Sequence, residues 1–333
     1  MSHAIKFGRR GLLNAAVAGL VGIGLGVSVS VSRAEWPEKP VTIIVPAGAG
    51  GGTDATARLL AQRLEAKFKQ PFNVVNVGEG GGLVGISRIV AARPDGYTLG
   101  VLFNYAHYKE LGQADITAAG FTPIAQYNFD PASLNVRADG AFKTAADLIG
   151  AIKDNPGKFN ISCGGGCGGS WALAFAGLLS SRGIAVEKLQ MIPAQGAAAG
   201  MLELAAGTLD VVPCSLPEAA SMISAGKARP LAVLAKTRNS AFPDVPTIKE
   251  AIGVDFAAGA WRGVVGPAKL PAEINARIEA ALKEIVADAG FVKAMQERGF
   301  GVEWRSGAEL GAFMKAHETD VGVLMKALGL AKK

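Results

Sequence analysis

The sequence contains little of what disulfide scaffolds, metal centres and hydrolytic triads are built from. Its 333 residues include three cysteines and three histidines, and aromatic residues make up only 7%. Three cysteines are too few for a disulfide scaffold. After residue 34 the histidines are His107 and His317, which leaves little for a zinc site or a Ser-His-Asp triad. We therefore expect no metal and no cofactor.

A strong excess of charge is also missing once the first 34 residues are set aside. The formal net charge is +6, but Lys6, Arg9, Arg10 and Arg33 precede the first acid, Glu35, which leaves +2 for the remainder. Nucleic-acid binding is therefore not indicated. The 50% hydrophobic content is typical of an α/β protein with buried strands and Ala/Leu-rich helices.

The first 34 residues predict an export signal. Basic residues between positions 6 and 10 precede an apolar, Gly- and Ala-rich run at 12–31, and Ser32-Arg33-Ala34 fits a cleavage site. The segment GRRGLL resembles a twin-arginine signal. Because the apolar run is rich in glycine and is followed closely by the cleavage site, a membrane span is disfavoured. We expect cleavage after Ala34 and an exported product.

Residues 41–64 read as a buried strand that breaks into a glycine run and restarts as a helix. The run 41–45 is β-branched, Gly50, Gly51 and Gly52 allow a tight turn, and Thr53 or Asp54 is a suitable N-cap. The first N–H groups of such a helix have no intrahelical partner, and its dipole adds about half a positive charge. We therefore expect an anion there, a carboxylate or a phosphate.

Two nucleotide-binding interpretations of this turn fail. A P-loop requires a Gly-Lys-Ser/Thr ending, and no lysine occurs between Lys39 and Lys67. The Rossmann fingerprint requires a third glycine where Thr53 stands. A carboxylate or other small-anion site remains, beside the alternative of a purely structural turn.

The strand, glycine turn and helix pattern recurs along the chain. Residues 71–77 and 97–103 read as further strands, and a second glycine turn and helix lie between them. This repetition predicts a parallel sheet, in which ligands sit beyond the carboxyl ends of the strands. Both glycine turns and residues 104–108 would lie on that edge.

The chain resembles the substrate-binding proteins of tripartite tricarboxylate transporters, the Bug-type family. The resemblance is carried, in order, by WPEKPVTIIVPAGAGGGTDATARLLAQRL, GGLVGISRIVAARPDGYTL, FTPIAQ, NPGKFNIS, GTLDVVPCSLPEA, AGKARPLAVLAKTR and FPDVPTIKEAIG. It implies a periplasmic type II α/β binding protein of two lobes, each a mostly parallel sheet flanked by helices. It also implies a small carboxylate, amide or aromatic acid as ligand, and transient contact with a membrane permease. We expect a monomer.

Two strands mark the expected crossings between the lobes. Residues 121–129 read as a strand that leaves the first lobe, and 261–267 as the strand that returns to it. We therefore predict that residues 35–130 and 257–333 form lobe one, and that 131–256 form lobe two.

The resemblance also implies ligand contacts in both lobes. In lobe one they are Ala47, Gly52, Thr53, Asp54, Gly81, Gly82, Asn104 and His107. In lobe two they are Ser162, Cys163, Gly166, Cys167, Ser170, Ala194 and Cys214. Asp54 could instead cap the helix, because its carboxylate would repel an anionic ligand. Several hydroxyls of the family pattern are glycine or cysteine here, so we expect a different ligand from that of better-matched members.

Arg262 is the last candidate ligand contact. It lies where the returning strand enters lobe one, so its guanidinium could clamp a carboxylate with two hydrogen bonds. The alternative is a surface arginine on a connecting strand.

The cysteines leave three further alternatives open. Cys163 or Cys167 could act as a thiolate nucleophile with His107 as base, although no third orienting group is evident. Cys163 and Cys167 could form a disulfide in an exported protein if their Cα atoms come within about 7 Å, and the alternative is free thiols packed as small hydrophobes. Cys163, Cys167 and Cys214 together could bind a soft metal. We favour a binding protein with no catalytic residue.

Overall fold

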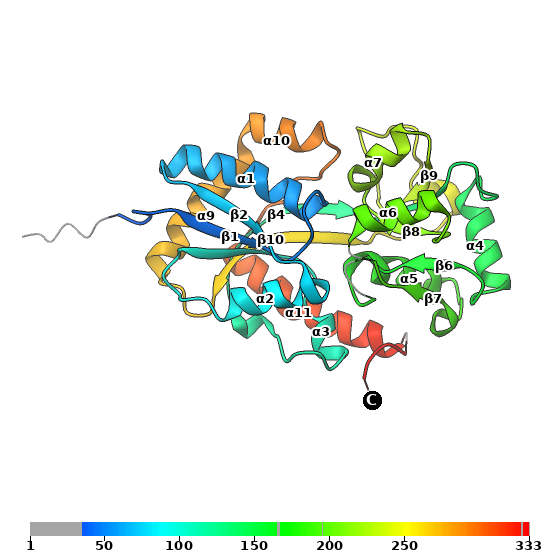
Figure 1. Cartoon of the computed structure of the whole chain (residues 1–333), viewed down its shortest axis with the longest axis horizontal. Helices are drawn as coiled ribbons and strands as arrows, with labels where there is room; N and C mark the ends of the chain where they lie inside the picture. Colours follow the sequence, from blue (N-terminus) through cyan, green and yellow to red (C-terminus); the bar gives the residue numbers. More distant parts are fainter. Residues whose placement is uncertain (1–34, 165–166, 195, 328, 333) are drawn as a thin grey trace, which may run out of the picture. The chain divides into compact units, whose positions relative to one another are not determined.

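The computed structural model describes residues 35–333 except 165–166, 195, 328 and 333 (Figure 1). The predicted signal peptide, its twin-arginine motif and its cleavage site lie outside the described residues. Among the residues that are described, no helix is both long and apolar enough to cross a membrane.

The first sheet begins with the predicted parallel strands. They are β1 (Val41–Val45), β2 (Phe72–Asn76) and β3 (Thr98–Leu102), and β1 pairs in parallel with both neighbours. Helices α1 (Gly52–Phe68) and α2 (Leu83–Val90) supply the crossovers between successive strands, as the glycine turns predicted. The carboxyl ends of these strands therefore meet at one edge.

Two long antiparallel strands extend this sheet and join it to the rest of the chain. Strand β4 (Phe121–Pro131) pairs with β10 (Gly259–Pro267), with Pro131 opposite Gly259, and the sheet order is β11-β4-β10-β3-β1-β2. The chain thus leaves the sheet at the end of β4 and returns at the start of β10 (Figure 1). This strand pair supports our proposal that the lobes divide near residues 131 and 257.

The segment between β4 and β10, lobe two, departs from the expected mostly parallel sheet. Strand β5 (Ser133–Arg137) is antiparallel to both β8 (Val212–Cys214) and β9 (Ala228–Val233). A separate pair, β6 (Asn160–Ser162) and β7 (Gln190–Ile192), is parallel. The expectation is wrong for β5, which continues directly from β4 and so carries the chain away from the first sheet, whereas its neighbours β8 and β9 run the opposite way.

Helices cover both groups of strands. In lobe two they are α4 (Ala145–Asp154), α5 (Ser170–Ser181), α6 (Ala197–Ala206), α7 (Leu216–Ser224) and α8 (Ile248–Ile252). Around the first sheet α3 (His107–Glu110), α9 (Ala272–Ala287), α10 (Ala289–Gln296) and α11 (Gly307–Ala327) join α1 and α2, and β11 (Arg305–Ser306) forms one edge. Short 3-10 turns occupy Glu79–Gly82, Ala118–Gly120 and Val186–Lys188.

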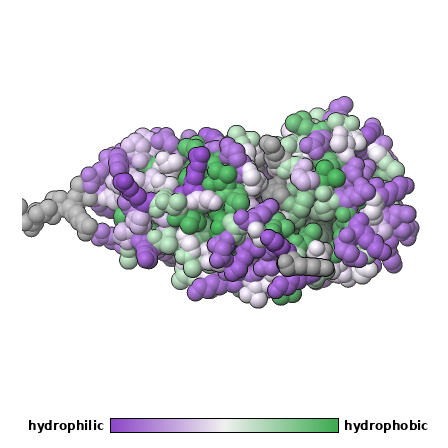
Figure 2. Space-filling model, turned by 60° about the horizontal axis from the view of Figure 1, so that its bottom comes forward, coloured by the Kyte–Doolittle hydropathy of each residue, from purple (hydrophilic) through white to green (hydrophobic). Residues whose placement is uncertain are grey.

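The two groups of elements have separate hydrophobic cores. One core packs α4, α5 and α6 against β5 and β8, with Phe175, Leu178 and Leu204 fully buried. The first sheet carries others on its faces, around residues such as Ile43 and Ile89. On the face shown in Figure 2, polar residues dominate the outline and apolar ones gather toward the middle. Separate cores leave the junction between the groups free to hold a ligand site.

Candidate functional site

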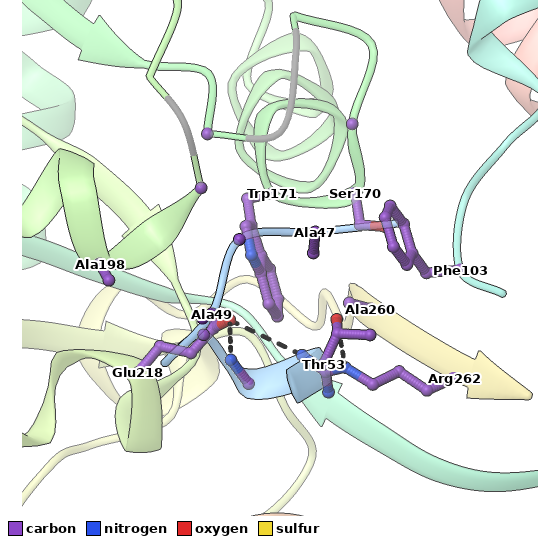
Figure 3. A pocket seen from close by; sticks show the side chains of 16 residues that line it. Ala47, Ala49, Thr53, Phe103, Ser170, Trp171, Ala198, Glu218, Ala260 and Arg262 are labelled. Atoms are coloured by element: carbon purple, nitrogen blue, oxygen red, sulfur yellow. Dashed lines mark hydrogen bonds and ion pairs between the residues drawn. The ribbon is translucent and has the colours of Figure 1, made fainter. Parts of the chain in front are cut away.

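A small cavity lies where the edge of the first sheet meets lobe two (Figure 3). Its volume is about 90 Å³. Lobe one contributes Ala47, Gly48, Ala49, Gly51, Gly52, Thr53, Phe103, Ala260 and Arg262, and lobe two contributes Gly164, Gly169, Ser170, Trp171, Gly196, Ala198 and Glu218. The cavity therefore sits beyond the carboxyl ends of β1 and β3, as the parallel pattern predicted.

Three helix N-termini meet at this cavity. Residues at the start of α1, α5 and α6 all belong to its lining. The N-caps of α5 and α6 are Gly169 and Gly196, and no side chain among the described residues caps either helix. The hydroxyl of Ser170 is buried and has no hydrogen-bond partner among the described residues. This arrangement presents N–H groups and an unused hydroxyl to whatever the cavity holds.

The N-terminus of α1, in contrast, is already occupied by a carboxylate of the chain itself. Glu218 Oε1 accepts a hydrogen bond from the Gly52 N–H at 3.1 Å. Its Oε2 accepts from the Ser215 N–H at 3.2 Å and from the Ser215 hydroxyl at 3.0 Å, which forms the capping box of α7. One buried side chain thus serves helix ends on both sides of the cavity, as Figure 3 shows for the α1 side.

Arg262 lines the cavity but is bound by the protein. It is 1% exposed, so the alternative of a surface arginine is wrong. Its Nε donates to the Thr53 hydroxyl at 3.0 Å, and its Nη1 donates to Asn128 and to the Asp130 carboxylate. Its Nη2 lies 3.7 Å from Glu218 Oε1. Burial lowers the pKa of Arg262, but Asp130 and Glu218 raise it more, so the guanidinium stays charged. A carboxylate clamp at Arg262 stays a prediction, and such a clamp would compete with these partners.

Asp54 lies outside the cavity lining. The helix starts one residue before Thr53, at Gly52, and its N-cap is Gly51, so the expected cap at Thr53 or Asp54 is wrong. The physical reason is that the Glu218 carboxylate accepts the hydrogen bond of the Gly52 N–H, which is the role that a capping side chain next to the helix start would have had. Asp54 instead accepts from the Gly50 N–H at 2.9 Å and pairs with Arg58 at 2.9 Å. Burial raises the pKa of Asp54, but the hydrogen bonds and the ion pair lower it by more, so the pKa is below its usual value and the carboxylate stays ionised.

Asn104 and His107 form a second contact between the lobes, outside the cavity lining. The Asn104 amide donates to the Gly168 carbonyl at 2.9 Å, and its oxygen lies 3.2 Å from His317 Nε2. His107 packs directly on Gly168, where a Cβ would come within 2.5 Å of the His107 Cβ. Burial lowers the pKa of both histidines to about 4, so both are neutral at pH 7.

The remaining predicted ligand contacts either pack against other parts of the protein or lie outside the cavity lining. Gly82 (φ +103°) lies so close to Pro46 that a Cβ would meet its carbonyl at 2.5 Å, and the Gly81 carbonyl accepts from Tyr108 at 2.7 Å. Ser162 is buried beneath Gly200. Ala194, Cys163 and Cys167 also lie outside the lining, and Gly166 lies outside the described residues. Of the predicted contacts, the cavity brings together Ala47, Gly52, Thr53, Ser170 and Arg262.

Cys163 and Cys167 form a disulfide, with their Cα atoms 4.6 Å apart. Of the alternatives left open, the structure has the bridge, and free thiols, a thiolate nucleophile or a soft-metal site at these residues are wrong because both sulfurs are bonded. Cys214 is buried, and its sulfur accepts from Asn135 at 3.4 Å. The described residues contain no cluster of metal-binding side chains.

The sequence interpretation missed Glu218, Trp171 and Phe103 as cavity residues. Trp171 and Phe103 supply aromatic walls on the two sides (Figure 3). A signal for Glu218 exists, since Ser215-x-x-Glu218 after a strand is a capping-box pattern that predicts a helix start. That pattern predicts the contact to Ser215 and says nothing about the contact to Gly52.

Comparison with known proteins agrees with this geometry. Residues 56–330 match the family model described as the tripartite tricarboxylate transporter family receptor. A solved TctC solute-binding protein from Polaromonas is 32% identical, covering 88% of this chain and 100% of that one, with a TM-score of 0.65. The periplasmic binding protein BugD is 26% identical over 90% of this chain and 100% of its own, with a TM-score of 0.79.

A third structure was determined with a ligand. Rpa4515 of R. palustris, solved with adipate, is 25% identical, covers 89% of this chain and 99% of its own, and has a TM-score of 0.81. These matches confirm the expected two-lobed type II fold and the expected family. The chain therefore belongs to the tripartite tricarboxylate transporter receptor family of periplasmic binding proteins, which are solute-binding receptors and not enzymes.

Proposed function

We propose that the protein captures a small carboxylate, or a related amide or aromatic acid, in the cavity between its lobes. It then delivers this ligand to a membrane permease. The observation that carries the proposal is the meeting of three helix N-termini at one cavity, of which those of α5 and α6 have no side-chain cap among the described residues. Adipate in a relative that shares the fold supports an organic acid as the ligand, although that relative's ligand has two carboxylates. A volume of about 90 Å³ suits a small acid better than a drug-sized ligand, which needs roughly 300 Å³ or more.

We infer that the ligand's carboxylate binds at the starts of α5 and α6. Glu218 already accepts from Gly52 at the start of α1, whereas α5 and α6 carry no side-chain cap among the described residues. The unpartnered hydroxyl of Ser170, the first residue of α5, is an additional donor. Trp171 and Phe103 would contact the apolar part of the ligand.

Export to the periplasm with cleavage after Ala34, and function as a monomer, belong to the same proposal. A binding protein of this kind works as a carrier that meets its permease only transiently. Mass spectrometry of the protein from a periplasmic extract would give the mature N-terminus. Size-exclusion chromatography with light scattering would give the mass in solution.

Thermal-shift screening followed by calorimetry tests the ligand class. The screen covers mono-, di- and tricarboxylates, aromatic acids and nicotinic-type compounds. A ligand at one hundred times its Kd should add about 2.7 kcal/mol to the free energy of unfolding. If no acid in the screen shifts the melting temperature, the proposed ligand class is wrong.

A cavity-filling substitution ties binding to this site. Ala198 is exposed at the cavity, two residues into α6, so Ala198→Trp should fill the cavity while leaving the cores intact. Ala206, at the other end of α6, is equally exposed and lies outside the lining, so Ala206→Trp is the matched control. We expect Ala198→Trp to weaken binding at least about tenfold and the control to bind like wild type. Equal binding by both variants would place the ligand elsewhere.

A further inference from the structure

We infer that Glu218 sets the ligand class of the cavity by excluding a second carboxylate. The cavity accepts an acid that has one carboxylate and, at its other end, a hydrogen-bond donor such as an amide or hydroxyl facing Glu218. This inference rests on the proposed function, namely that the cavity binds a small organic acid. It goes further by predicting that dicarboxylates are disfavoured.

The position of Glu218 carries the inference. Its carboxylate lines the cavity, is 7% exposed, and is fixed by donors from two separate helices, Ser215 before α7 and Gly52 in α1. The fit against α1 is close, because a Cβ at Gly52 would lie 2.8 Å from Glu218 Oε1 and 2.7 Å from Arg262 Nη2. A fixed, buried carboxylate cannot turn away from a ligand that enters.

The charges around Glu218 leave the cavity negative on this side. Among the described residues, its lining contains two ionisable side chains, Glu218 and Arg262. The Arg262 guanidinium is paired with the buried Asp130 carboxylate, which is bonded to Nη1, while Glu218 lies 3.7 Å from Nη2. One cation thus faces two anions, so no positive charge is left over for a ligand carboxylate on this side. His107 and His317, which are neutral at pH 7, lie outside the lining.

A purely structural role for Glu218, as the N3 residue of a capping box, makes a different prediction. Glutamine also serves at this helix position. Glu218→Gln therefore keeps a capping side chain and its volume but removes the negative charge. If the carboxylate only caps α7, this change leaves ligand selectivity unaltered. If the charge excludes a second carboxylate, selectivity changes.

Matched ligand pairs provide the test. Succinate, glutarate and adipate are each compared with their half-amides, succinamate, glutaramate and adipamate, by calorimetry at about pH 8, where both ligand carboxylates are ionised. Each pair differs only in whether the second end is a carboxylate or an amide. We expect wild type to bind a half-amide at least about tenfold tighter than the matching dicarboxylate, because like charges in a desolvated site are costly. We expect Glu218→Gln to reduce this ratio about tenfold or more.

A second capping box supplies the control. Glu250 holds the same N3 position in α8, accepts from the Thr247 N–H, and lies outside the cavity. Glu250→Gln should therefore leave the ratio at its wild-type value. Dicarboxylates bound by wild type as tightly as their half-amides would overturn the inference, as would an unchanged ratio in Glu218→Gln. The wild-type ratio decides even if Glu218→Gln fails to fold. Absence of binding by every acid screened would instead overturn the proposed function itself.

Discussion

At the scale of single residues, the centre of the site is Arg262, which lines the cavity and also bonds to several other buried side chains. Arg262 contacts Thr53 from α1, Asn128 and Asp130 from β4, and lies near Glu218 from lobe two. Both buried carboxylates, Glu218 and Asp130, are paired with Arg262. Burial raises the pKa of Glu218 above its ordinary value, and Arg262 offsets only part of this rise.

Arg262→Ala should therefore act first on stability. Removal of one partner from a buried ion pair leaves the other charge uncompensated, which typically costs about 3–5 kcal/mol. We expect a loss of this size in urea unfolding at pH 7. Arg238→Ala is the control, because Arg238 pairs with Glu250 at a half-exposed position where an ion pair contributes about 1 kcal/mol or less.

The outcome also separates the two roles of Arg262. A variant of wild-type stability that loses ligand affinity would support the clamp and contradict a structural role for the buried ion pairs of this arginine. A variant that loses stability in the absence of ligand supports the structural role, and its affinity must then be measured well below its melting temperature.

At the scale of elements, the loop between β6 and α5 connects the disulfide to the cavity. The bridge joins Cys163, which follows β6, to Cys167, close to the start of α5. After the bridge, Gly168 accepts from Asn104 of lobe one, and Gly169 and Ser170, the N-cap and first residue of α5, line the cavity. The bridge therefore restrains the segment that we propose binds the ligand carboxylate.

Reduction of this disulfide should weaken both folding and binding. Loss of a native bridge typically costs about 2–4 kcal/mol, and a short loop such as this one belongs near the lower end. We expect reductant to lower the melting temperature and to weaken ligand affinity. The Cys163→Ala/Cys167→Ala double variant should resemble the reduced protein and be insensitive to reductant, because the remaining Cys214 is free and buried. A wild-type protein whose affinity is unchanged by reduction would show that the bridge does not organise the site.

At the scale of the whole molecule, two buried histidines link the stability of the protein to pH. His107 lies against Gly168, Tyr108 and His317, and His317 lies against Asn104, Trp261 and Phe313, with Asp320 the nearby acid. Burial is the main cause that lowers the pKa of each to about 4. Both residues lie at the second contact between the lobes, so their protonation affects the fold as a unit.

Stability should fall as the pH drops from about 6.5 to 4. In the unfolded chain each histidine binds a proton near pH 6.5, whereas in the folded protein it does so only near pH 4. Because the unfolded state binds more protons in this window, the free energy of unfolding rises with pH and the contribution is complete above about 6.5. A shift of this size corresponds to about 3 kcal/mol for each histidine.

Urea unfolding at a series of pH values checks this expectation. The slope between pH 6.5 and 4.5 should be reduced in His107→Asn and in His317→Asn. Carboxylates with lowered pKa, such as Asp54, contribute mainly below this range. A wild-type stability that stays constant from pH 7 to 4.5 would show that the two histidines are not buried as neutral side chains.

Much of the fold could be predicted from local sequence because its determinants are local. The β-branched run at 41–45 and the alternation of strand and helix predicted β1, β2 and β3 at or within one residue of their observed bounds. The helix α1 was also predicted, although it starts earlier and ends later than expected. The strand β10 was predicted in the same way. Cys163 and Cys167 are close enough in sequence for the loop itself to permit a bridge. Residue order also sufficed to identify the family.

Tertiary structure alone decided the chemistry of the cavity. The contact between Gly52 and Glu218 joins residues 166 positions apart, and that between Arg262 and Asp130 joins residues 132 apart. No periodicity or spacing encodes such pairs, because they depend on how lobe two meets the edge of the first sheet.

For the same reason the sequence predicted an anion at the start of α1 but not that the anion is the chain's own carboxylate. It also predicted a mostly parallel sheet in lobe two, whereas β5 is antiparallel to both of its neighbours. The sequence by itself thus determined the elements and the location of the site, and the packing of the two lobes determined which groups in that site remain available to a ligand.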